Sequence, residues 1–250
     1  MANHRFFAAG EVPDEGTMPL APTDVHHLRD VLRLEPGDEV VIAYGGEAHL
    51  VRLTAVGVEV SGVRLGSASA PDVPRVVLVQ GIGKGEKMDT VVRQATELGV
   101  ARIVPLLAER SVVRLDAAKA AARTERWRRI AAEAAKQSQR ADVPAIDAPM
   151  DAGALPGALG DALVLVCWED AADAPGIGAA IEAAGPAAEG AVAVVVGPEG
   201  GLTASEVGVL ADAGATVVSL GPTVLRTETA GVVALALALA ARGGLGYARG

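Results

Sequence analysis

Apolar and polar residues in the first 70 positions follow the short period of a β-rich module. Glu39–Ala43 and Glu47–Thr54 read as two strands of a hairpin around a two-glycine turn, and Val56–Leu65 supplies more strand. One early helix is predicted, with Thr23 as its N-terminal cap. Its apolar positions are spaced as on one helical face, at Val25, Leu28, Val31 and Leu32.

From residue 75 the pattern changes to alternating strands and helices. Leu163–Cys167 and Val192–Val196 are continuous apolar runs, typical of strands buried on both faces of a parallel sheet. Thr203 and Glu206 form the pattern of a capping box. Further strands are predicted at Arg75–Gln80, Arg102–Leu106 and Thr216–Leu220, and helices at Met88–Leu98, Thr124–Gln139, Thr203–Ala213 and Ala230–Arg242. The alternation predicts an α/β domain with a parallel sheet.

The domain boundary is expected at Ser67–Pro74, where small residues and proline gather. The chain is therefore predicted to hold two domains, residues 1–70 and 75–250. The stretch 148–190 is rich in Ala, Gly, Asp and Pro, and only one strand can be placed in it.

The net charge of −9 argues at first against a nucleic-acid partner. The distribution changes this conclusion. Residues 1–140 hold 19 of the 22 basic residues against 18 acids, whereas residues 141–250 hold 3 against 13. Within Arg102–Arg140 there are 10 basic residues and 4 acids. A basic segment therefore lies in an acidic chain, and RNA remains a possible partner.

Several classes of site are disfavoured by the sequence. The longest uncharged runs have 13 residues, too few for a membrane-spanning helix, and the first 16 residues lack the apolar core of a signal peptide. The single Cys167 cannot form an intrachain disulfide, which fits a reducing cytoplasm, and we expect a cytoplasmic protein.

No metal site is expected, because metal-ligand spacings are absent and the adjacent His26 and His27 diverge on a helix. No nucleophile motif is found.

Two glycine-containing loops follow predicted strands. Gly197–Gly201 reads Gly-Pro-Glu-Gly-Gly, and Leu220–Ala230 contains Leu-Arg-Thr-Glu-Thr before the last helix. Ligands of open α/β sheets bind beyond the carboxyl ends of strands. Taken singly, either loop could be only a turn with a helix cap, Thr227 being the cap of the last helix. A third loop, Gly81–Lys87, matches neither standard phosphate-binding pattern, and is either a flexible basic loop or a phosphate-contacting surface.

Together these loops resemble the signature segments of the α/β-knot (SPOUT) methyltransferases, and specifically of the RsmE-like 16S ribosomal RNA uridine N3-methyltransferases. The resemblance extends in the right order over nearly the whole chain, although 148–190 matches no motif. Further matching segments are Leu28–Arg33, Pro36–Asp38, Gly85–Met88, Glu97–Val100, Pro105-Leu106, Glu109–Ser111 and Trp127–Arg140.

The resemblance implies a trefoil-knotted domain that binds S-adenosyl-L-methionine, a PUA-like RNA-binding barrel before it, and a homodimer. The substrate it implies is a uridine N3 in the decoding region of 16S rRNA, in the assembled small ribosomal subunit. Trp168 and Glu169 are expected to add a further wall to the cofactor site. The residues that would line the cofactor are Gly197, Pro198, Glu199, Gly200, Gly201, Leu220, Gly221, Leu225, Arg226 and Thr227.

Methyl transfer to uridine N3 requires loss of a weakly acidic proton. Arg226 is the only cation in the two loops, and Glu199 and Glu228 are the only acids. We hypothesise that Arg226 holds the uracil carbonyl or a phosphate and favours the N3 anion, with Glu228 or Glu199 as the base. The alternative is that these side chains only brace the loop.

Arginines crowd the predicted helix 124–139, more densely than an ordinary solvated face requires. We predict that this face contacts phosphates, which positions RNA without reading its sequence. The predicted RNA contacts are Arg126, Arg128, Arg129, Lys136 and Arg140 on or beside this helix, with Arg29, Arg33, Lys84, Lys87 and Arg110 elsewhere. Alternative functions are a knot-fold methyltransferase acting on a ribose 2′-hydroxyl, or a non-catalytic RNA-binding or ribosome-assembly factor.

Overall fold

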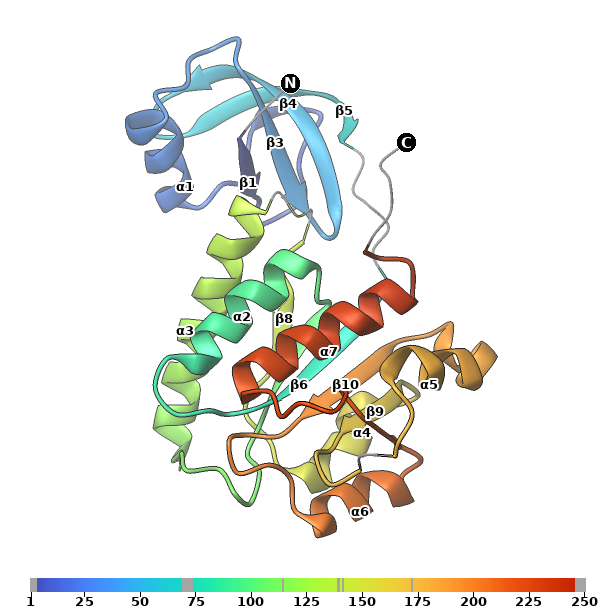
Figure 1. Ribbon diagram of the computed structural model, residues 1–250. Helices are drawn as coiled ribbons and strands as arrows, with labels where there is room; N and C mark the ends of the chain where they lie inside the picture. Colours follow the sequence, from blue (N-terminus) through green and yellow to red (C-terminus); the bar gives the residue numbers. More distant parts are fainter. Residues whose placement is uncertain are drawn as a thin grey trace. The chain divides into compact units, whose positions relative to one another are not determined.

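The computed structural model describes residues 4–68, 74–113, 115–138, 140, 142–171 and 173–245 (Figure 1). The chain divides into two compact units. The first comprises Met1–Pro71 and Ala135–Val143, and the second comprises Asp72–Ala134 and Pro144–Gly250. Most of the predicted boundary, at positions 69–73, lies outside the described residues. That residues 135–143 cluster with the first unit is not predicted from the sequence.

The first unit is built on a five-stranded sheet in the order β1-β3-β4-β5-β2. An isolated antiparallel bridge between Ala8 and Leu20 joins the segments that follow the two edge strands and so brings the sheet edges together. The predicted hairpin is confirmed as β3 and β4. The strands are β1 (Arg5–Phe7), β2 (Glu15–Thr17), β3 (Glu39–Tyr44), β4 (Glu47–Val56) and β5 (Val60–Ala68). This unit has its own apolar core, which includes Phe6, Leu28, Ile42 and Leu53.

The early helix is confirmed, but its predicted cap is wrong. Helix α1 (Pro22–His26) begins after Ala21, which makes no side-chain capping bond, and Thr23 lies within the first turn. Proline at the first helical position has its φ already fixed near the helical value and lacks the N–H that would stay unpaired there. The chain continues through a π-helical turn at His27–Val31.

The second unit contains a six-stranded sheet in the order β11-β9-β10-β6-β7-β8, in which every pair is parallel. The predicted parallel-sheet domain is therefore confirmed. The central strand β10 (Val192–Val196) is buried at all of its positions, as its unbroken apolar sequence predicts. The other strands are β6 (Val76–Gly81), β7 (Arg102–Leu106), β8 (Ala145–Ile146), β9 (Leu163–Cys167) and β11 (Thr216–Val218).

Helices cover both faces of this sheet (Figure 1). Alternate strand residues pack against two different helix layers, because side chains of a strand point to opposite faces. One apolar cluster joins the sheet to α2 (Lys87–Leu98), α3 (Ala117–Gln137), α5 (Ile177–Ala184) and α7 (Thr227–Ala241). The other joins it to α4 (Leu155–Leu159) and α6 (Ala204–Asp212). The short α4 and α5 fill the stretch 148–190, in which the sequence predicts only a strand.

Two ends of the later helices confirm the predicted local signals, whereas α3 and α7 start at other residues than predicted. Gly99 ends α2 with φ +104°, a left-handed conformation that favours glycine, and the Thr203–Glu206 capping box at α6 is confirmed. Helix α3 begins at Ala117, seven residues earlier than predicted, because the alanine-rich segment before Thr124 continues the helix. Its predicted last residue, Gln139, lies outside the described residues. Thr227, expected as a cap, is the first residue of α7 instead.

Within the described ranges, no helix combines the length and the apolarity that crossing a bilayer requires. In the same residues, no group of three or more His, Cys, Asp or Glu side chains is placed to hold a metal ion.

Candidate functional site

A cavity of about 510 Å³ opens at the carboxyl ends of the central strands of the second unit. The register pairs Val196, the last residue of β10, with both Gln80 and Cys167, so these strands end at the same edge. The volume lies in the usual range of small-molecule sites, about 300–1,000 Å³. The lining residues are Lys87, 167–169, 196–199, Gly201, 219–227 and Ala230.

The two loops singled out in the sequence form most of this cavity. Of the ten residues predicted to line a cofactor, all but Gly200 line it. A side chain at Gly200 would meet Arg110 instead, since an added Cβ would lie 2.9 Å from the Arg110 Cβ atom and carbonyl oxygen. The expected further wall, Trp168 and Glu169, is also present in the lining. The sequence therefore locates the cavity well.

Two glycines allow the loops to approach this closely. A Cβ atom at Gly81, the last residue of β6, would overlap the backbone of Pro198. At Gly201 the φ angle is +70°, and a Cβ atom there would overlap the Glu169 carboxylate. Backbone therefore packs against backbone at Gly81, and at Gly201 backbone packs against a carboxylate, which glycine permits because it has no side chain.

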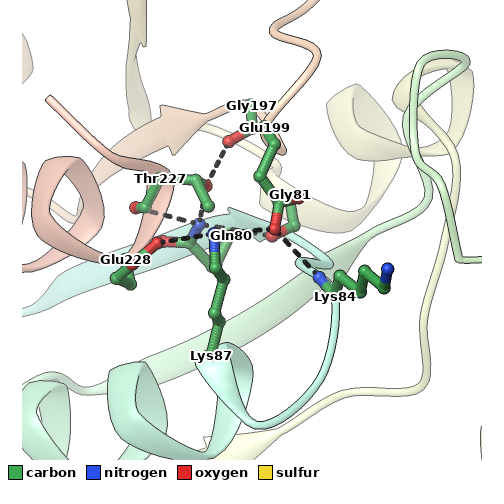
Figure 2. A network of polar contacts seen from close by, with 8 residues as sticks. All are labelled: Gln80, Gly81, Lys84, Lys87, Gly197, Glu199, Thr227 and Glu228. Carbon is green, nitrogen blue, oxygen red and sulfur yellow. Dashed lines mark hydrogen bonds and ion pairs between the residues drawn. The ribbon is translucent and has the colours of Figure 1, made fainter. Parts of the chain in front are cut away.

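Lys87 lies between the two acids of the signature loops (Figure 2). Its Nζ atom is 2.9 Å from Glu199 Oε1 and 3.2 Å from Glu228 Oε2. The backbone N–H of Lys84 also donates to Glu199 Oε1, over 3.0 Å. The first turn of α2, the loop after β10 and the first turn of α7 therefore meet at one ammonium group. Lys87, predicted as an RNA contact, lines the cavity in this position.

These contacts change the acidity of the three groups. Partial burial works to raise the pKa of Glu199, but the hydrogen bonds from Lys87 and from the Lys84 backbone outweigh it and lower the pKa. The hydrogen bond from its own backbone N–H is the largest influence on Glu228, and with Lys87 it lowers that pKa against the effect of burial. The hydrogen bond to Glu199 raises the pKa of Lys87. Both acids are therefore ionised at neutral pH, and Lys87 is protonated.

Sequence reasoning missed Gln80, which is only 1% exposed. Its Nε2 atom donates to Thr227 Oγ1 over 2.9 Å, and that hydroxyl donates to the Gly197 carbonyl over 2.6 Å (Figure 2). Thr227 therefore joins two loops rather than capping its helix. The available signal was a single amide in a strand that is otherwise apolar up to Gly81.

Arg226 and Cys167 differ sharply in what they can offer a ligand. The Arg226 side chain is exposed at the cavity and forms no ion pair or hydrogen bond with the described residues. Burial raises the pKa of the Cys167 thiol to about 12, so this thiol stays protonated and is not a nucleophile. The site can thus bind and orient a charged ligand, with Arg226 available as the cation.

Some of the basic side chains of α3 form ion pairs and hydrogen bonds within the protein. Arg126 pairs with Asp89 and, over 3.4 Å, with Glu86. Asp89 also accepts a hydrogen bond from the buried Trp127 indole over 3.1 Å. Arg128 donates to the Ile146 carbonyl. Part of the arginine density therefore anchors α3 to α2 and to the sheet.

Other predicted RNA contacts also differ in availability. Within the first unit, three of them pair with acids: Arg29 with Asp30, Lys136 with Asp24, and Arg140 with Asp142. Arg110 donates to the Gly200 carbonyl over 3.3 Å. In the described part of the chain, the side chains of Arg33, Lys84 and Arg129 have no acidic partner. All three are exposed, and no acid among the described residues competes with a phosphate for them.

Known families match both parts of the chain. The family described as RNA methyltransferase domain matches residues 71–239, and the RNA methyltransferase PUA domain matches residues 20–57. The parallel-sheet domain with its cavity is thus the methyltransferase part of an RNA methyltransferase.

Individual relatives of this chain belong to the same class of enzyme. The ribosomal RNA small subunit methyltransferase E of Mycobacterium bovis is 35% identical over 92% of this chain and 88% of its own length. That of Bacillus subtilis is 32% identical over 90% of each. The chain belongs to the ribosomal RNA small subunit methyltransferase E family.

Solved structures of similar proteins support this assignment. The Neisseria gonorrhoeae ribosomal RNA small subunit methyltransferase E, bound to S-adenosyl methionine, has a TM-score of 0.79 and 32% identity. The similarity covers 93% of this chain and 95% of that one. A methyltransferase of Legionella pneumophila in complex with SAM has a TM-score of 0.76 and 28% identity, over 96% and 98% of the two chains.

The contacts of Lys87 make a prediction about acidity. In Lys87→Met, the pKa of Glu199 and that of Glu228 should both rise, because an ammonium group that lowers them is removed. The measurement is an NMR titration of glutamate side-chain carbons labelled with ¹³C. Lys119→Met is the matched control, since Lys119 pairs with Asp116 on the surface, away from both glutamates. Unchanged titration of both acids in Lys87→Met would contradict the geometry.

The same substitution should affect stability in a pH-dependent way. A carboxylate whose folded pKa is lowered stabilises the fold above the ordinary glutamate pKa of about 4.3 and loses this effect as the pH falls through the folded value. The difference in free energy of unfolding between wild type and Lys87→Met should therefore be present at pH 7 and shrink on acidification. Denaturant unfolding at several pH values measures it.

Proposed function

We propose that this protein transfers a methyl group from S-adenosyl-L-methionine to N3 of a uridine in the decoding region of 16S rRNA, within the assembled small ribosomal subunit. One observation carries the proposal: both signature loops line a single cavity at the carboxyl edge of a parallel sheet, in a chain of this family. The bound S-adenosyl methionine in the Neisseria relative supports the choice of cofactor.

The residues at the cavity fit such a cofactor. Gly197 and Gly201 both line the cavity, and neither has a side chain that would take up space in it. The buried Nε1 atom of Trp168 has no hydrogen-bond partner among the described residues, which leaves a donor at the cavity wall. Leu220 and Leu225 provide an apolar surface for a base ring. When bound, the cofactor supplies an electrophilic methyl group on a sulfonium.

Within the proposal, positioning supplies much of the catalysis. Arg226 orients the uracil through a carbonyl oxygen and stabilises the N3 anion. Glu228 or Glu199 accepts the N3 proton. Because the pKa of each acid is lowered, each is a weak base, and stabilisation of the anion by Arg226 has to supply part of the driving force.

We also propose how the rest of the chain contributes. Residues 1–70 bind RNA and residues 75–250 form a knotted catalytic domain, a division supported by the two matched families. The protein works as a cytoplasmic homodimer. Support for the dimer comes from apolar side chains exposed on the second unit, Val224 at 92% beside the cavity and Leu237 at 44% on α7.

For RNA, the proposal includes all ten predicted basic residues except Lys87, which the ion pairs assign to the cavity. Arg33, Lys84 and Arg129 contribute most, because no acid neutralises them within the described ranges. Arg110 and Lys84 belong to loops that touch the Gly-Pro-Glu-Gly-Gly segment, so they are suited to hold phosphates that flank the target nucleotide.

The direct test is transfer of a labelled methyl group onto small subunits that lack the modification. Mass spectrometry of the digested RNA should then find the label in 3-methyluridine, with free 16S rRNA as the comparison substrate. A labelled 2′-O-methyl nucleoside would show a different target atom. Absence of transfer together with absence of cofactor binding by calorimetry would point to a non-catalytic RNA-binding factor.

Arg226→Ala should abolish methylation while the affinity for S-adenosyl-L-methionine stays within a few-fold, since the role of Arg226 is toward the uracil. Arg226→Lys retains the charge but loses the planar fork, and should recover only part of the rate. Calorimetry and labelled transfer measure the two quantities separately. Unchanged turnover in Arg226→Ala would remove this assignment.

RNA binding should weaken steeply with salt, by about 0.7–0.9 log units in affinity per log unit of salt for each phosphate neutralised. Arg129→Ala should lower this slope by about one phosphate. Arg126→Ala, on the same helix, should lower the slope less, because Arg126 already pairs with Asp89 and Glu86. Filter binding to small subunits at several salt concentrations measures the slopes. Equal slopes for wild type and Arg129→Ala would exclude the contact.

A further inference from the structure

We propose that Gln80 is a positioning residue that fixes the two cofactor loops relative to one another and thereby sets the affinity for the methyl donor. This inference rests on the proposed function for the identity of the cofactor. Gln80 itself does not line the cavity, so its effect has to pass through Thr227 and Gly197.

The hydrogen bonds form a directed chain. Gln80 Nε2 has one good acceptor, the Thr227 hydroxyl at 2.9 Å, and longer contacts to the carbonyl oxygens of Gly81 and Thr227. The Gly197 carbonyl can only accept, so the Thr227 hydroxyl uses its one proton for this bond, and its oxygen remains free to accept from Gln80. The amide on β6 therefore holds the Thr227 hydroxyl where it can reach the other loop.

This bond has a special place among the loop contacts. Gly197 begins the segment after β10, and Thr227 ends the segment after β11. In the described part of the chain, Thr227 Oγ1 to Gly197 O is the one hydrogen bond that directly joins 197–201 to 220–227. Lys87 also pairs with Glu199 and with Glu228, the residue after the second segment, but these are ion pairs between long side chains (Figure 2). The bond from Thr227 to Gly197 thus defines the spacing of the backbones that line the cavity.

Helix α7 has a glycine at the position where the Gln80 amide packs against it. A Cβ atom at Gly231, within the helix, would overlap Gln80 Oε1. Glycine is unfavourable in a helix interior, and the neighbouring positions of α7 are mostly alanine, valine and leucine. Gln80 Oε1 is buried without a hydrogen-bond partner among the described residues. The glycine in the helix and the unpaired oxygen both destabilise the fold, and we infer that they are kept because the amide fixes the position of Thr227.

The decisive variant is Gln80→Met, which keeps the length of the side chain, loses the donor and does not touch the ligand. Calorimetry should show S-adenosyl-L-methionine bound about tenfold more weakly, the effect of about one buried hydrogen bond. The KM for the small subunit should stay within about twofold. Thr227→Val should weaken cofactor binding similarly, and Thr227→Ser, which keeps the hydroxyl, should restore it to within about threefold of wild type.

Two comparisons separate positioning from simple destabilisation. Gly231→Ala should weaken cofactor binding, whereas Gly208→Ala, a helical glycine of α6 with open space around it, should not. The double variant Gln80→Met/Thr227→Val should bind no more weakly than either single variant, because both break one chain of bonds.

Cofactor affinity that is unchanged in Gln80→Met, or effects of the two substitutions that simply multiply, would overturn the inference while leaving the proposed function intact. Absence of cofactor binding by the wild-type protein would instead contradict the proposed function. Denaturant unfolding of each variant shows whether it is folded at the temperature of the binding experiment.

Discussion

The parallel pairing of β10 with β6 and β9 is the constraint on which the site depends. Parallel strands in register end at a common edge, so the chain segments that leave them have to begin side by side. Segments from sequence positions near 81, 168 and 197 therefore share one small volume. The glycine at position 81 is a consequence, because backbones that start this close leave no space for a side chain.

A second layer of interactions turns this shared edge into a polar site of defined charge. Lys87 balances two acids that come from different loops, and Gln80 orders a hydroxyl between them. One of these contacts is partly exposed and ionic, and the other is buried and neutral. The ionic contact responds to pH and salt, whereas the buried one is insensitive to both. The site thus combines ion pairs that depend on pH and salt with a buried hydrogen bond that does not.

Much of this arrangement could be predicted from the sequence. Unbroken apolar runs located β9 and β10 to the residue, and the glycine-rich loops located the cavity wall, since both signals are local. The contacts of Lys87 and Gln80 could not be predicted, because their partners lie more than 100 positions away along the chain. The start of α3 was predicted seven residues too late, because its alanine-rich first part has no periodic pattern of large apolar residues. The density of basic residues within Arg102–Arg140 also overstates the charge available to RNA, since ion pairs such as Arg126–Asp89 neutralise part of it.

The division of the chain into units has a consequence for how such proteins can change. Because residues 135–143 cluster with the first unit, the polypeptide passes from one unit to the other three times. Neither unit is a continuous stretch of sequence. A single cut of the chain near residue 75 would leave residues 135–143 with the second unit, although they cluster with the first. One recombination event at that point therefore cannot exchange a whole unit between proteins. The two units are therefore inherited together, and changes in the second have to remain compatible with a segment of the first that is encoded inside it.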